Sequence, residues 1–132
     1  MEQMLSKWQP AVLSLFRFIT GLLLFQYGVA KILKFPPESR FVNVELMTRY
    51  GAAGLLELVL GALLIFGLFT RPVAFILSGE MAFAYFLGHF PKGFLPILND
   101  GSLAIALCFS CLYLATAGGG PISLDVLLRK KS

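Results

Sequence analysis

Five ionisable side chains lie within or at the ends of strongly apolar stretches, and they are the residues of this chain best placed to do chemistry. They are Arg17, Lys31, Glu57, Glu80 and His89. A charged side chain near the centre of a bilayer costs about 2.5–3.5 kcal/mol on an insertion scale, so such groups turn inward, pair or take part in function. We therefore expect these five residues to form a candidate functional polar cluster.

The composition indicates that the surroundings of this cluster are lipid. The 132 residues are 58% hydrophobic and only 14% charged, and the mean hydropathy is +0.81. A soluble domain carries about 25% charged residues, and a chain of this length could not bury so much apolar surface on its own. We expect a single membrane domain over residues 1–132, with the lipid bilayer as its main partner.

Four apolar runs approach the roughly 20 residues that a membrane-spanning helix needs. They cover residues 11–33, 51–69, 73–90 and 102–118. Pro10 stands at a helix-start position, and Asn99 or Asp100 could cap the last run. Only Thr70, Arg71 and Pro72 separate the second and third runs, which must therefore be antiparallel neighbours. The sequence predicts an all-α fold, a four-helix transmembrane bundle.

The net charge of +4 comes mostly from basic residues at the ends of the apolar runs. That distribution is typical of membrane anchoring rather than of nucleic-acid binding, and we expect no nucleic-acid partner. With four spans both termini share one side, and the terminal Arg129, Lys130 and Lys131 favour the cytoplasm for it. The segment ISLDVLLRKK fits a short amphipathic surface helix capped by Ser123.

Helical spacing predicts how the charges meet. In the first run Arg17, Gly21, Leu24, Gly28 and Lys31 share one narrow face. The comparable faces are Gly54, Glu57 and Gly61 in the second run, Glu80, Ala84 and Gly88 in the third, with His89 at its exit, and Ala104, Cys108, Cys111, Ala115 and Gly118 in the fourth. Depth along the helices predicts two ion pairs, Lys31 with Glu57 and Arg17 with Glu80. Such pairs could be purely architectural or could serve function.

Four stretches of the chain, taken together, resemble a known family. The stretches TGLLLFQYGVAKILKF (20–35), GLLELVLGALLIFGLFTRPVA (54–74), MAFAYFLGHFPKGFLPILNDG (81–101) and ATAGGGPISLD (115–125) are similar in order and spacing to the DoxX family of bacterial membrane proteins. The residues that match the family pattern are Gly28, Lys31, Glu57, Gly61, Gly67, Arg71, His89, Ser123 and Asp125. The chain departs from it at Ser102, where the family often has Glu.

The resemblance implies a multi-pass protein of the bacterial inner membrane. DoxD-type relatives serve as membrane subunits of a thiosulfate:quinone oxidoreductase, and other members are linked to membrane redox complexes and oxidative-stress defence. The implied role is a small subunit or accessory of a quinone-linked redox complex, with other redox proteins as partners and a quinone as the implied cofactor. Lys31, Glu57 and His89 could exchange protons with a quinone head group.

Two other functions compete with this role. A membrane thiol oxidoreductase could use Cys108 and Cys111, which lie three residues apart on one helical face. However, reactive cysteines need an electropositive, partly exposed setting, and small packing residues are the simpler interpretation. A small-solute transporter or a non-catalytic structural partner is the other alternative, and four short spans leave room for a pathway only in a homo-oligomer. A single His and the absence of ligand spacing predict no metal site.

Overall fold

The computed structural model describes residues 2–33, 49–99 and 101–131, and all regular structure within them is helical. The elements in chain order are α1 (Glu2–Ser6), α2 (Gln9–Gly28), the π-helical turn η1 (Val29–Leu33), α3 (Arg49–Phe66), α4 (Thr70–Ala84), the π-helical turn η2 (Tyr85–His89), the 3-10 turn η3 (Phe90–Lys92), α5 (Pro96–Asn99), α6 (Ser102–Ala117) and α7 (Leu124–Lys131). The segment FVNVELM (41–47), for which the sequence predicts a short helix in the membrane interface, lies outside the described residues.

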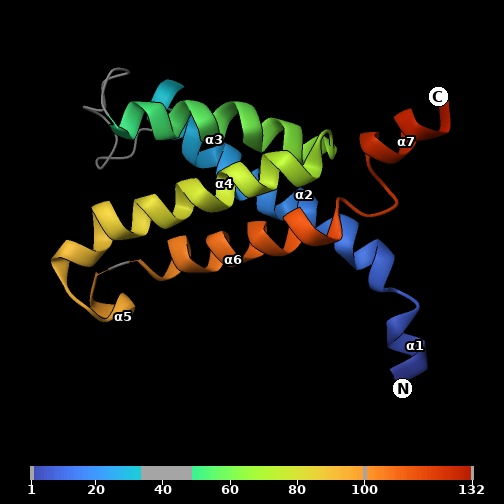
Figure 1. Ribbon diagram of the computed structural model, residues 1–132, viewed down its shortest axis with the longest axis horizontal. Coiled ribbons are helices and arrows are strands. Elements are labelled where there is room, and N and C mark those ends of the chain that lie inside the picture. The colour runs from blue at the N-terminus through green and yellow to red at the C-terminus, as the bar shows by residue number, and fades with distance from the viewer. Residues whose placement is uncertain (1, 34–48, 100, 132) are drawn as a thin grey trace.

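The four long helices among the described residues are α2, α3, α4 and α6, and they lie alongside one another (Figure 1). Helix α2 packs along α3, α4 packs along α6, and α3 and α4 form a hairpin that joins the two pairs. Both termini, with α1 and α7, lie at one end of these helices, which we call the terminal end, and α5 lies at the other. This arrangement is consistent with a chain that reverses direction at the end of each long helix.

Two of the helical segments, Gln9–Leu33 and Thr70–Lys92, are long and apolar enough to cross a membrane. The apolar helices Gly51–Phe66 and Ser102–Ala117 are shorter. Large apolar side chains such as Phe75, Phe83 and Phe109 are 63–70% exposed on the outside of the helices, where lipid can cover them. The all-helical fold and the membrane character are thus supported, while a bundle that spans the membrane four times stays a prediction.

Glycines allow α2 and α3 to approach closely, as the predicted faces require. A Cβ added at Gly21 would lie 2.7 Å from the backbone nitrogen of Ile65, and one at Gly61 would lie 2.9 Å from that of Phe25. A Cβ at Gly28 would collide with the backbone of Leu58. Backbone-to-backbone contact of this kind is characteristic of small residues at helix interfaces in membranes.

Two predicted helix boundaries need correction. The turn between α3 and α4 is made by residues 67–69, because Gly67 (φ 73°) and Phe69 (φ 54°) adopt left-handed conformations that end α3. Helix α4 therefore starts at Thr70, ahead of Pro72. Asn99 does not cap α6, whose N-cap is Gly101; its side-chain oxygen instead accepts the Gly101 backbone N–H at 2.9 Å. Asp100 lies outside the described residues.

Candidate functional site

The predicted pairing of Lys31 with Glu57 is confirmed by the structure. The Lys31 Nζ lies 3.0 Å from Oε1 and 3.1 Å from Oε2 of Glu57. The Glu57 side chain is only 2% exposed. Lys31 starts from η1, beside Gly54, whose missing side chain leaves room for the lysine stem. The ammonium therefore reaches about one turn inward along α3 to meet the carboxylate.

The predicted pairing of Arg17 with Glu80 is wrong, because Glu80 lies beside Glu57 instead. The two carboxyl groups interact across the α3–α4 hairpin. Glu57 precedes the end of α3 by nine residues and Glu80 follows the start of α4 by ten, so both lie about 14–15 Å from the turn. Among the described residues, no backbone or side-chain donor reaches the two buried oxygens of Glu80, whose carboxyl neighbour is Glu57.

Three of the described side chains form a group that we call the carboxyl cluster: Lys31, Glu57 and Glu80. One ammonium faces two carboxyl groups in a setting from which water is largely excluded. Two carboxyl groups placed side by side repel each other when both are ionised, and a proton shared between them relieves that repulsion. The arrangement can therefore hold one proton close to the middle of the α3–α4 hairpin and release it to a suitable acceptor.

Arg17 is used at the terminal end rather than in the carboxyl cluster. Its Nη1 donates to the backbone oxygens of Gly119 at 3.2 Å and Ile122 at 2.9 Å, and the residue is 5% exposed. The Ser14 hydroxyl accepts the Ile122 backbone N–H at 3.0 Å. The segment after α6 thus folds back over α2, and its carbonyl groups, rather than Glu80, accept the hydrogen bonds of the guanidinium.

His89 also lies apart from the carboxyl cluster. It ends η2, nine residues or about 13 Å along the helix from Glu80. Its Nδ1 lies 3.0 Å from the Asn99 backbone oxygen, and its ring stacks on Tyr85 at 6.4 Å between centroids. The predicted group of Lys31, Glu57 and His89 is therefore not assembled, and His89 helps to order the α5 end.

Asn99 is a residue whose structural importance the sequence did not reveal. It is fully buried, and its Nδ2 donates to the Gly93 backbone oxygen at 2.8 Å and to the Tyr85 hydroxyl at 3.2 Å. With the bond to Gly101, the amide holds both sides of the loop between η3 and α6. The Asp100-Gly101 dipeptide in the sequence signals a turn after Asn99, but the tertiary partners of the Asn99 amide carry no sequence signal.

Cys108 and Cys111 are free thiols in the packing between α4 and α6. Cys111 is fully buried within the core. The Sγ of Cys108 lies 3.5 Å from the Ser78 hydroxyl, which also donates to the Cys108 backbone oxygen at 2.9 Å. Both thiols therefore pack between the helices as small apolar side chains do. No group of three His, Cys, Asp or Glu that could hold a metal ion occurs among the described residues.

Asp125 performs a task that its position in the sequence does not indicate. Its two carboxylate oxygens accept the backbone N–H groups of Phe69 at 2.7 Å and Thr70 at 2.9 Å. It thereby caps the start of α4 from a distant part of the chain, and its own N–H donates to Gly67 at 3.0 Å. The predicted capping of the last helix is confirmed, since the Ser123 hydroxyl accepts the Val126 N–H at 3.4 Å.

A helical chain with lipid-type outer surfaces and charges buried between glycine-packed helices has the character of a small integral membrane protein. The family model described as DoxX matches residues 12–90, and the chain belongs to that family. A protein of Haemophilus influenzae, described as an uncharacterized protein, is 40% identical over 131 residues, which cover 96% of this chain and 98% of that one. No solved structure matches the chain.

Proposed function

We propose that this DoxX family protein is a small subunit or accessory of a quinone-linked redox complex in the bacterial inner membrane. In this proposal the chain crosses the membrane several times, has both termini in the cytoplasm, and works beside soluble or membrane-bound redox proteins. Family membership and the apolar outer surface support the membrane part. The carboxyl cluster is the observation that carries the redox part.

Quinone chemistry requires protons where water is scarce, and the carboxyl cluster fits that need. A bound quinone accepts two electrons and two protons on reduction. The Glu80 carboxyl group lies against that of Glu57, and its buried oxygens accept from no donor among the described residues, so a proton held by this pair could be donated to a quinone oxygen. Lys31 holds Glu57 in place and limits the negative charge of the pair. The residues present therefore suit a head group that exchanges protons.

The first test is to purify the tagged protein from native membranes in a mild detergent. Mass spectrometry of the proteins and extracted lipids, together with an absorption spectrum, identifies what accompanies the chain. We expect a stoichiometric redox protein or a retained quinone. A colourless protein that carries only phospholipid would contradict the redox role and would leave the buried charges as architecture or as part of a transport path.

Substitution of Glu80 by Gln sharpens the test, because it keeps the shape of the side chain and removes its proton exchange. We expect Glu80→Gln to preserve the assembly and to lower its quinone-dependent turnover at least tenfold. Ser78→Ala is the matched control, since Ser78 is buried two residues away on the same helix and carries no charge. Equal turnover in Glu80→Gln and the wild type would remove the carboxyl cluster from the mechanism.

A further inference from the structure

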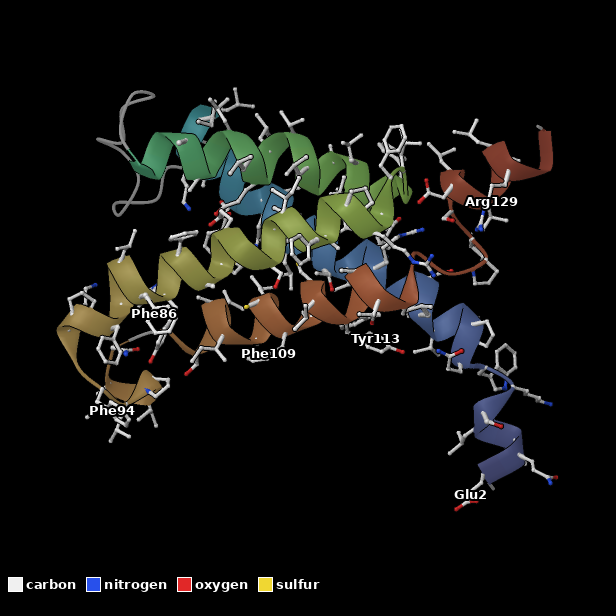
Figure 2. All side chains as sticks on the ribbon, viewed as in Figure 1. Glu2, Phe86, Phe94, Phe109, Tyr113 and Arg129 are labelled. Carbon is white, nitrogen blue, oxygen red and sulfur yellow. The ribbon has the colours of Figure 1, made fainter. Side chains whose placement is uncertain are left out.

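The terminal end of the molecule contains an open cavity of about 500 Å³ that the proposed redox role does not use. It lies between the start of α4, the end of α6 and the segment that leads into α7, around Gly118–Gly120. Its polar lining consists of Thr70, Arg71, Ser123, Asp125 and Arg129. Figure 2 labels Arg129, whose side chain projects from α7 on this side of the molecule.

Most acceptors around the cavity are already occupied by the fold. Both oxygens of Asp125 accept backbone N–H groups at the start of α4. The carbonyl of Gly119 accepts from Arg17, and that of Gly120 accepts from the Ser123 hydroxyl at 3.0 Å. These four acceptors are thus already used by the fold and do not need a bound cation.

Donors, in contrast, remain in excess. The Thr70 side chain is 1% exposed, and its hydroxyl has no hydrogen-bond partner among the described residues. That hydroxyl faces Gly119, where an added Cβ would come within 2.7 Å of it. The Arg71 guanidinium lies close to the backbone of Gly118. A Cβ added to that glycine would be 3.5 Å from the Arg71 Nε. Neither glycine carries a side chain that would fill the space between these donors.

From this imbalance we propose that the cavity binds a phosphate group, with Arg71 as its principal contact and the Thr70 hydroxyl as a second donor. Arg129 adds positive charge to the same lining. A planar guanidinium matches phosphate geometry through paired hydrogen bonds. The phosphate comes either from the head group of an anionic phospholipid or from free inorganic phosphate. Basic pockets between helices at the membrane surface are typical of phospholipid head-group sites, and the terminal end is where such a surface would lie.

The test uses the full-length protein in a maltoside detergent, which carries no phosphate. Three probes are added separately: phosphatidylglycerol, diacylglycerol with the same acyl chains, and sodium phosphate. Native mass spectrometry counts bound lipid, and thermal unfolding reports stabilisation by each probe. We expect phosphatidylglycerol to bind and stabilise while diacylglycerol does not. Competition by millimolar sodium phosphate would identify the phosphate itself as the ligand, and its failure would assign the site to the lipid.

Substitutions in the cavity lining test whether phosphatidylglycerol binds in this cavity. Arg71→Gln should weaken phosphatidylglycerol binding about tenfold or more, as the loss of a charge-assisted hydrogen bond does. Lys92→Gln is the matched control, because it removes one exposed positive charge at the opposite end and should leave binding unchanged. Thr70→Val removes the second donor and should weaken phosphatidylglycerol binding by less than Arg71→Gln does. Thr70→Ser keeps the hydroxyl and should bind as the wild type does. Equal binding in Arg71→Gln and the wild type, equal losses in Arg71→Gln and Lys92→Gln, or no preference over diacylglycerol would each overturn the proposal.

Discussion

Helix α2 and the turn η1 that continues it bury two cations on one face, and the structure satisfies them in different ways. Lys31 meets a carboxylate on the neighbouring helix α3, whereas Arg17 meets two backbone carbonyls of an irregular segment. The first contact joins two helical segments, η1 and α3, that pack side by side. The second closes the terminal end with the part of the chain that follows α6. The comparison shows that the location of a buried charge can be predicted more readily than its partner.

The largest expected effect comes from removing both carboxyl groups of the carboxyl cluster. Glu57→Gln combined with Glu80→Gln removes the two carboxyl groups that face Lys31 in the carboxyl cluster, and we expect a loss of about 3–5 kcal/mol in unfolding free energy. Glu57→Gln alone should cost much less unfolding free energy, since Glu80 lies close enough to replace Glu57 as the carboxylate that faces Lys31. Unfolding in mixed micelles with increasing dodecyl sulfate measures the difference. If the single and double variants lose equal stability, Glu80 has no part in balancing Lys31.

Exchanging the charges gives an independent check on the same pair. Lys31→Glu places three carboxyl groups together and should lower the yield of folded protein. The double variant Lys31→Glu with Glu57→Lys restores one cation between two carboxyl groups, and we expect it to recover most of the folded yield. Size-exclusion profiles of the purified variants report this recovery. A double variant that folds no better than either single change would refute the pairing.

Arg17 should show a smaller and more local effect. Arg17→Met leaves the carbonyls of Gly119 and Ile122 without their donor, and we expect a cost of about 2–4 kcal/mol for the two buried groups. Because these bonds fasten the terminal segment rather than the long helices, residues 118–131 should become sensitive to protease first. Limited proteolysis followed by mass spectrometry locates the cuts. Cleavage that starts instead between α2 and α3 would show that Arg17 supports the helix packing directly.

The smallest expected effects separate two glycines that look alike in the sequence. Gly28→Ala forces α2 and α3 apart at Leu58 and should cost about 1–3 kcal/mol. Gly79→Ala meets no atom within 4 Å and should stabilise α4 by about 0.5–1 kcal/mol through helix propensity. Thermal unfolding of both variants in one detergent provides the comparison. If close helix contact is specific to the α2–α3 interface, Gly28→Ala must lower the unfolding temperature and Gly79→Ala must raise it.

Much of the fold followed from patterns that repeat along regular helices. Heptad spacing placed Gly21, Gly28 and Lys31 on one face, and the structure confirms that face as the contact with α3. The pairing of Lys31 with Glu57 was accessible because rise and period fix both positions. These features depend only on local geometry that the sequence encodes directly.

The remaining features depend on where the chain turns and on what irregular segments offer. Glu80 was misplaced because its depth was counted from a helix start near Pro72, whereas Gly67 and Phe69 move the turn earlier. The partners of Arg17 are carbonyl groups, which every residue possesses, so no residue type announced them. The cap that Asp125 provides for α4 likewise requires knowledge of how the end of the chain folds back.

The contact between Arg17 and the segment after α6 has a consequence for the assembly of the protein during synthesis. The acceptors of Arg17 lie 102 and 105 residues further along the chain. At a translation rate of about 5–20 residues per second, the ribosome needs roughly 5–20 s to produce them. During that interval the guanidinium must remain hydrated or be sheltered by the insertion machinery. Closure of the terminal end is therefore a late step of biogenesis, and a nascent chain stalled before Ile122 would present an open form to quality control.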